Sequence, residues 1–192
     1  MVHPEFPPEA DPPPADVEGI AVVLPDQVRQ TILSYLAHQG KKQVPAIVEG
    51  IEDERRCLVS LLPDISEEQA RFVPWAGRWS IRDVVQHVVA FEREVVEVIA
   101  GLAGATAPPD EPPTQGRSLA ELRQRLTSVR AQLLDLVGGL AEDANPEARH
   151  EHFLLGPLRW KEWLASLRVH DRDHIGQIEA IQRMPMYPEA SG

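Results

Sequence analysis

The sequence predicts an all-α protein, a four-helix bundle with a short extra helix and a proline-rich arm at its N-terminus. Four long segments carry apolar residues three and four positions apart, which is the spacing of one buried helix face. No segment alternates apolar and polar residues for long enough to predict a strand. Two connections rich in proline and glycine, each about fifteen residues or longer, are long enough to cross over the bundle.

The N-terminal quarter divides into an arm and a helix. Residues 1–25 contain seven prolines, a density that excludes a helix or a central strand and favours an extended arm. Asp26 is a good N-cap residue for a helix over residues 26–40, whose apolar positions recur at helical spacing. We expect this accessory helix to lie outside the four-helix bundle.

Residues 43–183 are expected to form the bundle, followed by a tail over residues 184–192. The four bundle helices are expected at residues 43–62, 80–102, 118–140 and 160–183. Ser80 with Asp83, and Ser118 with Glu121, have the spacing of capping boxes, which open the second and third of these helices. We expect the first extra helix and the four long ones to account for the regular structure.

The charge balance argues against several classes of partner. The chain has 30 acidic and 19 basic residues and a net charge of -11, which disfavours nucleic acid and anionic lipid. No apolar run approaches the length of a membrane span, and residues 1–9 lack the features of a secretory signal. We therefore expect a cytoplasmic protein, with the single Cys57 as a small buried side chain.

His170 and His174 are the first candidate metal ligands. They lie four residues apart, so both project from one face of the last helix, and that face also carries Leu167 and Ile178. Two buried imidazoles without partners would cost about 1–3 kcal/mol each, whereas a shared metal ion satisfies both. The alternative is a pair of core histidines satisfied by other groups.

His87 is the third candidate ligand, because Val84, Val88 and Phe91 place it on the apolar face of the second bundle helix. Helix bundles commonly build metal sites from facing helices. Three imidazoles favour Zn, Ni or Fe, as well as Cu or Co, over Mg or Ca. They also leave at least one coordination position for water or a substrate, which is the geometry of a catalytic site.

The segments WSIRDVVQHV at residues 79–88 and HDRDHIGQI at residues 170–178 resemble the DinB/YfiT-like superfamily. The resemblance extends over about residues 43–183. It implies that His87, His170 and His174 bind one divalent metal ion. Characterised members of that superfamily include thiol S-transferases, mycothiol-dependent maleylpyruvate isomerases and some hydrolase-like proteins. The resemblance therefore also implies a small-molecule substrate, a low-molecular-weight thiol as cosubstrate and a homodimer.

Three further residues are candidates for a pocket above the metal. Glu54 and Arg55 interrupt the apolar stripe of their helix, so they either face a cavity or form an ordinary solvated turn. His152, like His150, falls in the connection before the last helix and either lines the pocket or lies at the surface.

Residues close to the candidate ligands have other expected roles. Asp171 and Asp173 flank the ligands without sharing their helix face, so support for the imidazoles has to come from elsewhere. Trp75 and Trp79 are expected to anchor the loop before the helix that carries His87.

The sequence leaves three functional hypotheses. The first is a metal-dependent enzyme, either a thiol S-transferase or a related transferase or hydrolase that acts on a small molecule. The second is a non-catalytic, metal-containing module that binds a small molecule or serves a stress response. The third is a bundle scaffold whose buried histidines bind no metal. Elemental analysis separates the third hypothesis from the first two.

Overall fold

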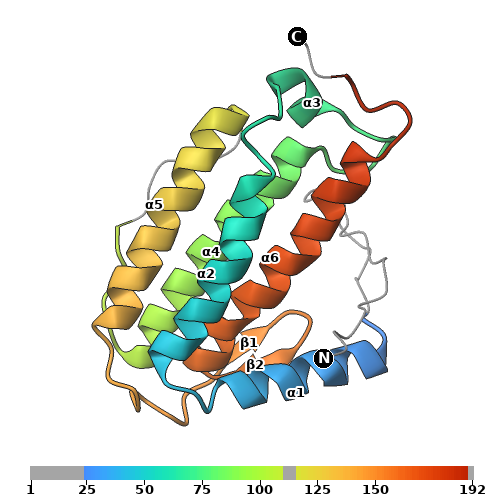
Figure 1. Ribbon diagram of the computed structural model, residues 1–192. Helices are drawn as coiled ribbons and strands as arrows, with labels where there is room; N and C mark the ends of the chain where they lie inside the picture. Colours follow the sequence, from blue (N-terminus) through green and yellow to red (C-terminus); the bar gives the residue numbers. More distant parts are fainter. Residues whose placement is uncertain (1–23, 110–115, 190–192) are drawn as a thin grey trace.

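The computed structural model describes residues 24–109 and 116–189 of the chain. The expected proline-rich arm therefore lies almost wholly outside the described residues. Within them, four long helices run side by side as a bundle, as the sequence predicts (Figure 1). Their bounds are α2 Val44–Ser60, α4 Ile81–Ala103, α5 Leu119–Gly138 and α6 Trp160–Gln182.

The order of packing places α6 at the centre of the contacts. Helix α6 packs against both α2 and α4, and α4 also packs against α5. Helix α1, Asp26–Gln39, contacts α6 and lies across the lower end of the bundle in Figure 1. Each predicted helix bound lies within two residues of the observed one, and the two capping boxes form as expected.

The structure adds a short helix and a two-stranded hairpin that the sequence did not predict. Helix α3, Glu67–Arg71, is a short helix that begins with a capping box of Ser66 and Gln69. Strands β1, His150–His152, and β2, Gly156–Leu158, form an antiparallel hairpin beside α1 (Figure 1). Strands of three residues are too short to show an alternating pattern, so this hairpin has no strand signature in the sequence.

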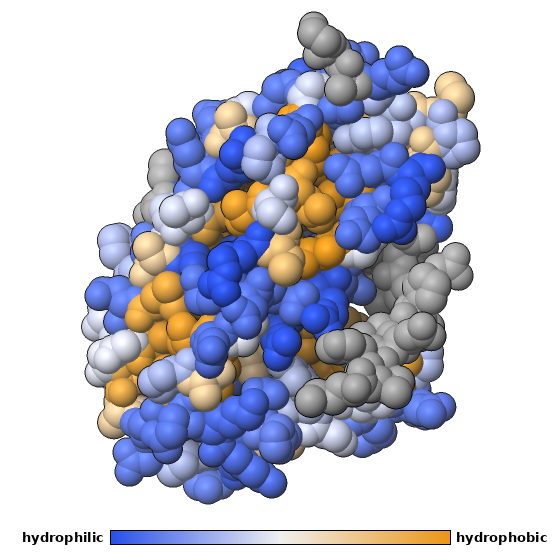
Figure 2. Space-filling model, in the orientation of Figure 1, coloured by the Kyte–Doolittle hydropathy of each residue, from blue (hydrophilic) through white to orange (hydrophobic). Residues whose placement is uncertain are grey.

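The apolar core has two parts. The part near α1 and the hairpin is built around Leu36, Ile51, Val95, Leu133 and Trp163. The other part, near α3, is built around Leu58, Val85, Leu122, Leu126 and Ile178. Hydrophilic side chains cover most of the face in Figure 2, with smaller apolar areas between them. Among the described helices, none has the length and apolar character needed to cross a bilayer.

A layer of buried ion pairs lies between the two apolar parts. Each of the four bundle helices contributes one charged side chain to it, and none is more than 5% exposed: Arg55, Glu92, Arg130 and Asp171. Arg55 donates to Glu92 at 2.6 Å and to both oxygens of Asp171 at 2.8 and 3.0 Å. Arg130 donates to Glu92 and, at 2.7 Å, to Glu52. We call these four residues the polar layer.

Two residues of α2 differ from expectation. Arg55 belongs to the polar layer, so the alternative of a solvated turn is wrong for this residue. Cys57 is exposed, and the expectation of a small buried side chain is wrong. The buried face of α2 continues at helical spacing from Ile51 through Arg55 to Leu58, and Cys57 lies off that face.

We predict that Arg55→Met destabilises the fold by about 3–5 kcal/mol, because it removes one of the two guanidinium groups that pair with the buried carboxylates of Glu92 and Asp171 and leaves only Arg130 beside them. Chemical denaturation measures the free energy of unfolding. Arg56→Met is the matched control, since Arg56 is exposed and its ion pair among the described residues is with exposed Asp53, so its loss should cost less than about 1 kcal/mol. Equal effects of the two changes would contradict a structural role for the polar layer.

Candidate metal centre

Three histidines from two helices meet between α4 and α6. The Ser80 and Asp83 capping box begins α4 two turns before His87 and so sets the turn of the helix from which His87 projects. His170 and His174 project from successive turns of α6, which packs against α4. The structure therefore brings together the three residues that the sequence selected as metal ligands.

The spacing of the ring nitrogens suits one shared ion. The Nε2 atom of His170 lies 3.1 Å from Nε2 of His87 and 3.2 Å from Nε2 of His174. Ligand nitrogens about 2.0–2.1 Å from a tetrahedral zinc ion lie about 3.3 Å apart, close to both values. Ligand atoms of the three residues all lie within 4.8 Å of one another. This geometry fits three of the four positions of a tetrahedral ion.

The Nδ1 atoms of His174 and His170 also support a shared ion at the Nε2 atoms. His174 donates from Nδ1 to the side-chain oxygen of Gln177 at 2.8 Å, which leaves a lone pair on its Nε2 atom. The Nδ1 atom of His170 is buried and has no hydrogen-bond partner among the described residues. Among the described residues, the polar neighbours of the His170 ring are therefore the Nε2 atoms of His87 and His174, which face its own Nε2 atom. A cation bound between these three atoms would give each of them a partner.

The surroundings keep the three imidazoles neutral, as metal ligation requires. Burial lowers the pKa of His87 to about 4, with a further contribution from His174. Burial also lowers the pKa of His170 well below its usual value, and the neighbouring histidines and Arg55 add to this effect. The pKa of His174 is lowered by burial, which outweighs the opposing effect of Asp173.

Aromatic rings enclose the centre. The Trp79 ring lies 4.8 Å from the ring of His87 and 6.3 Å from that of His174, between ring centroids. Phe91 stacks on His170 with centroids 4.0 Å apart and an angle of 18° between the planes. Trp79 is thus a wall of the centre as well as part of the loop, whereas Trp75 is half exposed and does not anchor that loop in the core.

The three residues predicted to line a pocket, Glu54, Arg55 and His152, lie in different parts of the structure. Glu54 is buried but pairs with Arg168 and Arg172 of α6, so it forms ion pairs instead of a solvated turn. Arg55 lies in the polar layer beside His170. His152 is buried on β1, so the alternative of a surface position is wrong for it, whereas His150 is exposed.

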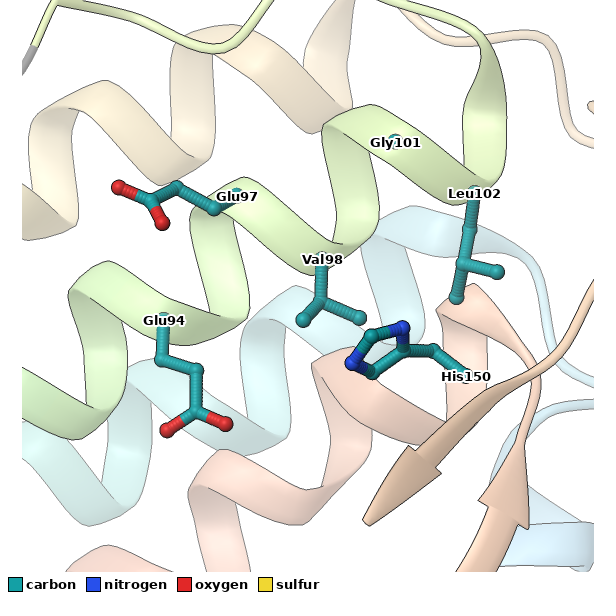
Figure 3. A pocket seen from close by; sticks show the side chains of 6 residues that line it. All are labelled: Glu94, Glu97, Val98, Gly101, Leu102 and His150. Atoms are coloured by element: carbon teal, nitrogen blue, oxygen red, sulfur yellow. The ribbon is translucent and has the colours of Figure 1, made fainter.

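A hollow of about 530 Å³ lies on the outer side of α4 and does not include the three histidines (Figure 3). Its lining is partly apolar, and its two carboxylates are exposed. The residues around it are Glu94, Glu97, Val98, Gly101, Leu102 and His150. This hollow is therefore a surface feature separate from the candidate metal centre.

Sequence reasoning missed Gln177, and it missed the partners of Asp171. Gln177 lies three positions after His174 on the same helix, a spacing at which side chains meet, and this signal was available in the sequence. Asp171 has its side chain in the polar layer, in agreement with the expectation that it does not share the face of the ligands. Its partners come from distant segments, which sequence spacing does not reveal.

The fold and the three-histidine cluster define the class as a helix bundle with a candidate metal centre. Residues 51–178 match the DinB superfamily, and the chain belongs to that family. The chain is also similar to the crystal structure of TT2238, described as a four-helix bundle protein. The two share 23% identity with a TM-score of 0.59, over 71% of this chain and 98% of that one. A comparison with curated proteins gives no match.

We predict that protein purified without an affinity tag holds about one transition-metal ion per chain, as measured by elemental analysis. His174→Ala should abolish stoichiometric binding, whereas His150→Ala, which changes an exposed histidine, should not. Gln177→Leu should weaken metal affinity by about ten- to a hundredfold, because it removes the acceptor that orients His174. A wild-type chain that binds no ion after loading with Zn, Ni or Fe would contradict the centre.

A second prediction concerns the pH dependence of the metal-free protein. The pKa of His87 and that of His152 are both lowered to about 4 by burial, against about 6.5 in the unfolded chain. The unfolded state therefore binds protons first as the pH falls. The free energy of unfolding should decrease between about pH 6.5 and 4, by up to about 1.4 kcal/mol per pH unit for each histidine.

Chemical denaturation at several pH values measures this slope. His152→Gln should reduce the slope, because it removes one of the buried histidines. His150→Gln should leave it unchanged, because His150 is exposed. Equal slopes for the two variants would show that burial of His152 does not contribute.

Proposed function

We propose that the protein is a metal-dependent enzyme that transfers a low-molecular-weight thiol to an electrophilic small molecule. The observation that carries this proposal is the cluster of three Nε2 atoms, with 3.1 and 3.2 Å between His170 and its two neighbours. His87 and His170 are partly exposed, so a small molecule can reach the centre from their side. Membership of the DinB superfamily agrees with this class of site.

The ligand set determines which chemistry the site favours. A bound divalent ion supplies Lewis acidity, which favours the deprotonated form of a thiol or of water at neutral pH. Because His87, His170 and His174 are neutral, they leave the positive charge of such an ion uncompensated and strengthen this effect. Among the described residues the cluster has three protein groups, which leaves a position for the cosubstrate.

The chain also shapes the space around the reacting groups. Trp79 and Phe91 present aromatic rings beside the ligands and exclude water from one side of the centre. In the transfer itself the thiol loses its proton to the solvent, and its sulfur forms a bond to a carbon of the electrophile. In a substitution, the bond between that carbon and its leaving group breaks and the electron pair departs with the leaving group. In an addition to a double bond, the π-electron pair moves to the neighbouring atom, which takes up a proton from the solvent.

We predict that the metal-loaded protein consumes a cellular thiol in the presence of at least one electrophile from a broad panel. Thiol loss is measured with glutathione, cysteine, coenzyme A and mycothiol in turn. His174→Ala should reduce the rate by at least about a hundredfold, because it removes one of the three ligands, while His150→Ala should retain it.

Two other results would each support a different function. Hydrolysis of an ester or amide without thiol consumption would indicate the related hydrolase. Persistent inactivity of the metal-loaded protein, together with tight binding of a small molecule, would contradict an enzyme and support the non-catalytic binding module.

A further inference from the structure

We propose that His152 donates a hydrogen bond from its Nε2 atom to an oxygen of the substrate, a carboxylate or carbonyl oxygen, beside the three-histidine centre. This inference rests on the proposed function and deepens it, because it names a group on the substrate that the site recognises. His152 acts here as a positioning residue for a part of the substrate that does not react.

The position of His152 relative to the centre is the first argument. The Phe91 ring contacts both histidines, with centroids 4.0 Å from His170 and 6.1 Å from His152. His152 is only 6% exposed, although it comes from the hairpin and not from the bundle. A small molecule bound at the centre and extending past Phe91 would therefore meet His152.

The proton on the His152 ring is assigned by its backbone contact. The backbone N–H of Leu154 donates to Nδ1 of His152 at 3.2 Å, so that nitrogen carries a lone pair. The ring is neutral near pH 7 because burial lowers its pKa to about 4. A neutral imidazole with a bare Nδ1 atom carries its proton on Nε2. His152 thus presents a donor of fixed identity.

That donor has no acceptor in the part of the chain that the structure describes. The neighbouring rings are aromatic: Trp163 lies at 4.9 Å, and Phe153 stacks at 5.1 Å with an angle of 11°. A phenylalanine would keep these ring contacts but would leave the Leu154 N–H without its acceptor, so Nδ1 has a structural role. The Nε2 donor has no such role among the described residues, and it is therefore available to an acceptor that arrives with a ligand.

The hairpin is held from both sides, as a positioning role requires. Arg29 of α1 donates to the carbonyl oxygens of Leu154 and Leu155 at 3.1 and 2.9 Å. Trp163 of α6 donates from Nε1 to the carbonyl oxygen of His150 at 3.3 Å. Gly156 has a φ of 84°, which permits the tight turn that a side chain would strain. These contacts fix the backbone around His152.

The charge of the centre favours an oxygen that bears negative charge. Within the described part of the chain, no carboxylate belongs to the three-histidine cluster, so a bound divalent ion would leave a net positive site. The nearby guanidinium of Arg55 is already paired with Glu92 and Asp171 and does not compete for the substrate. A thiol or electrophile with a carboxylate or carbonyl group a short distance from its reacting atom fits this arrangement.

The test compares matched thiols on the full chain loaded with Co²⁺, whose absorption spectrum reports thiol binding directly. Thioglycolate is compared with ethanethiol, and mercaptopropionate with propanethiol, so that each pair differs in the carboxylate. In wild-type protein at least one carboxylate thiol should bind more tightly than its partner. His152→Phe should weaken that carboxylate thiol by about ten- to a hundredfold and leave the plain thiols unchanged.

His152→Gln supplies the control for structural damage, because its amide restores a donor and should recover most of the lost affinity. Unchanged affinity of the carboxylate thiols in His152→Phe would overturn the inference, and so would equal weakening of carboxylate and plain thiols in both variants. If wild-type protein binds Co²⁺ and plain thiols but shows no effect of His152, the inference fails alone. If wild-type protein binds no Co²⁺, the proposed function fails as well.

Discussion

The ion pairs of the polar layer determine how the bundle helices face one another. A charged group buried in a protein retains its partner because losing that partner is costly, so Arg55 ties α2 to Glu92 on α4 and to Asp171 on α6. Helices α4 and α6 are also the two that carry the candidate metal ligands, and Asp171 is the neighbour of His170. A rotation of either helix about its axis would break the ion pairs and separate the imidazoles. The polar layer therefore fixes the same helix orientations that the candidate metal centre needs.

Much of this arrangement follows from local sequence. Helical spacing and capping boxes predict the four long helices, because each depends on residues a few positions apart. The same periodicity places His87, His170 and His174 on inward faces, and four-helix packing then brings them together. The sequence predicts the candidate site for this reason: its three residues occupy core positions where imidazoles are otherwise unexpected.

The features that escape prediction depend on contacts between distant segments. The sequence shows that Arg55 interrupts an apolar stripe, but its carboxylate partners lie 37 and 116 positions away. A single charged residue in an apolar stripe therefore gives the same sequence pattern whether its side chain is solvated or buried in ion pairs. The hairpin that buries His152 consists of two three-residue strands, too short for periodicity, and its place is set by Trp163 and α1.

The hydrogen bonds from Arg29 to the hairpin connect α1 with the region that carries His152. The family match covers residues 51–178, which contain every candidate metal ligand, whereas Arg29 lies in α1 outside that match. If the proposed function holds, the residues for reactivity lie in the bundle, while the position of His152 depends on a helix packed against its end. Substitutions in α1 would then change substrate selectivity during evolution without changing the candidate metal ligands.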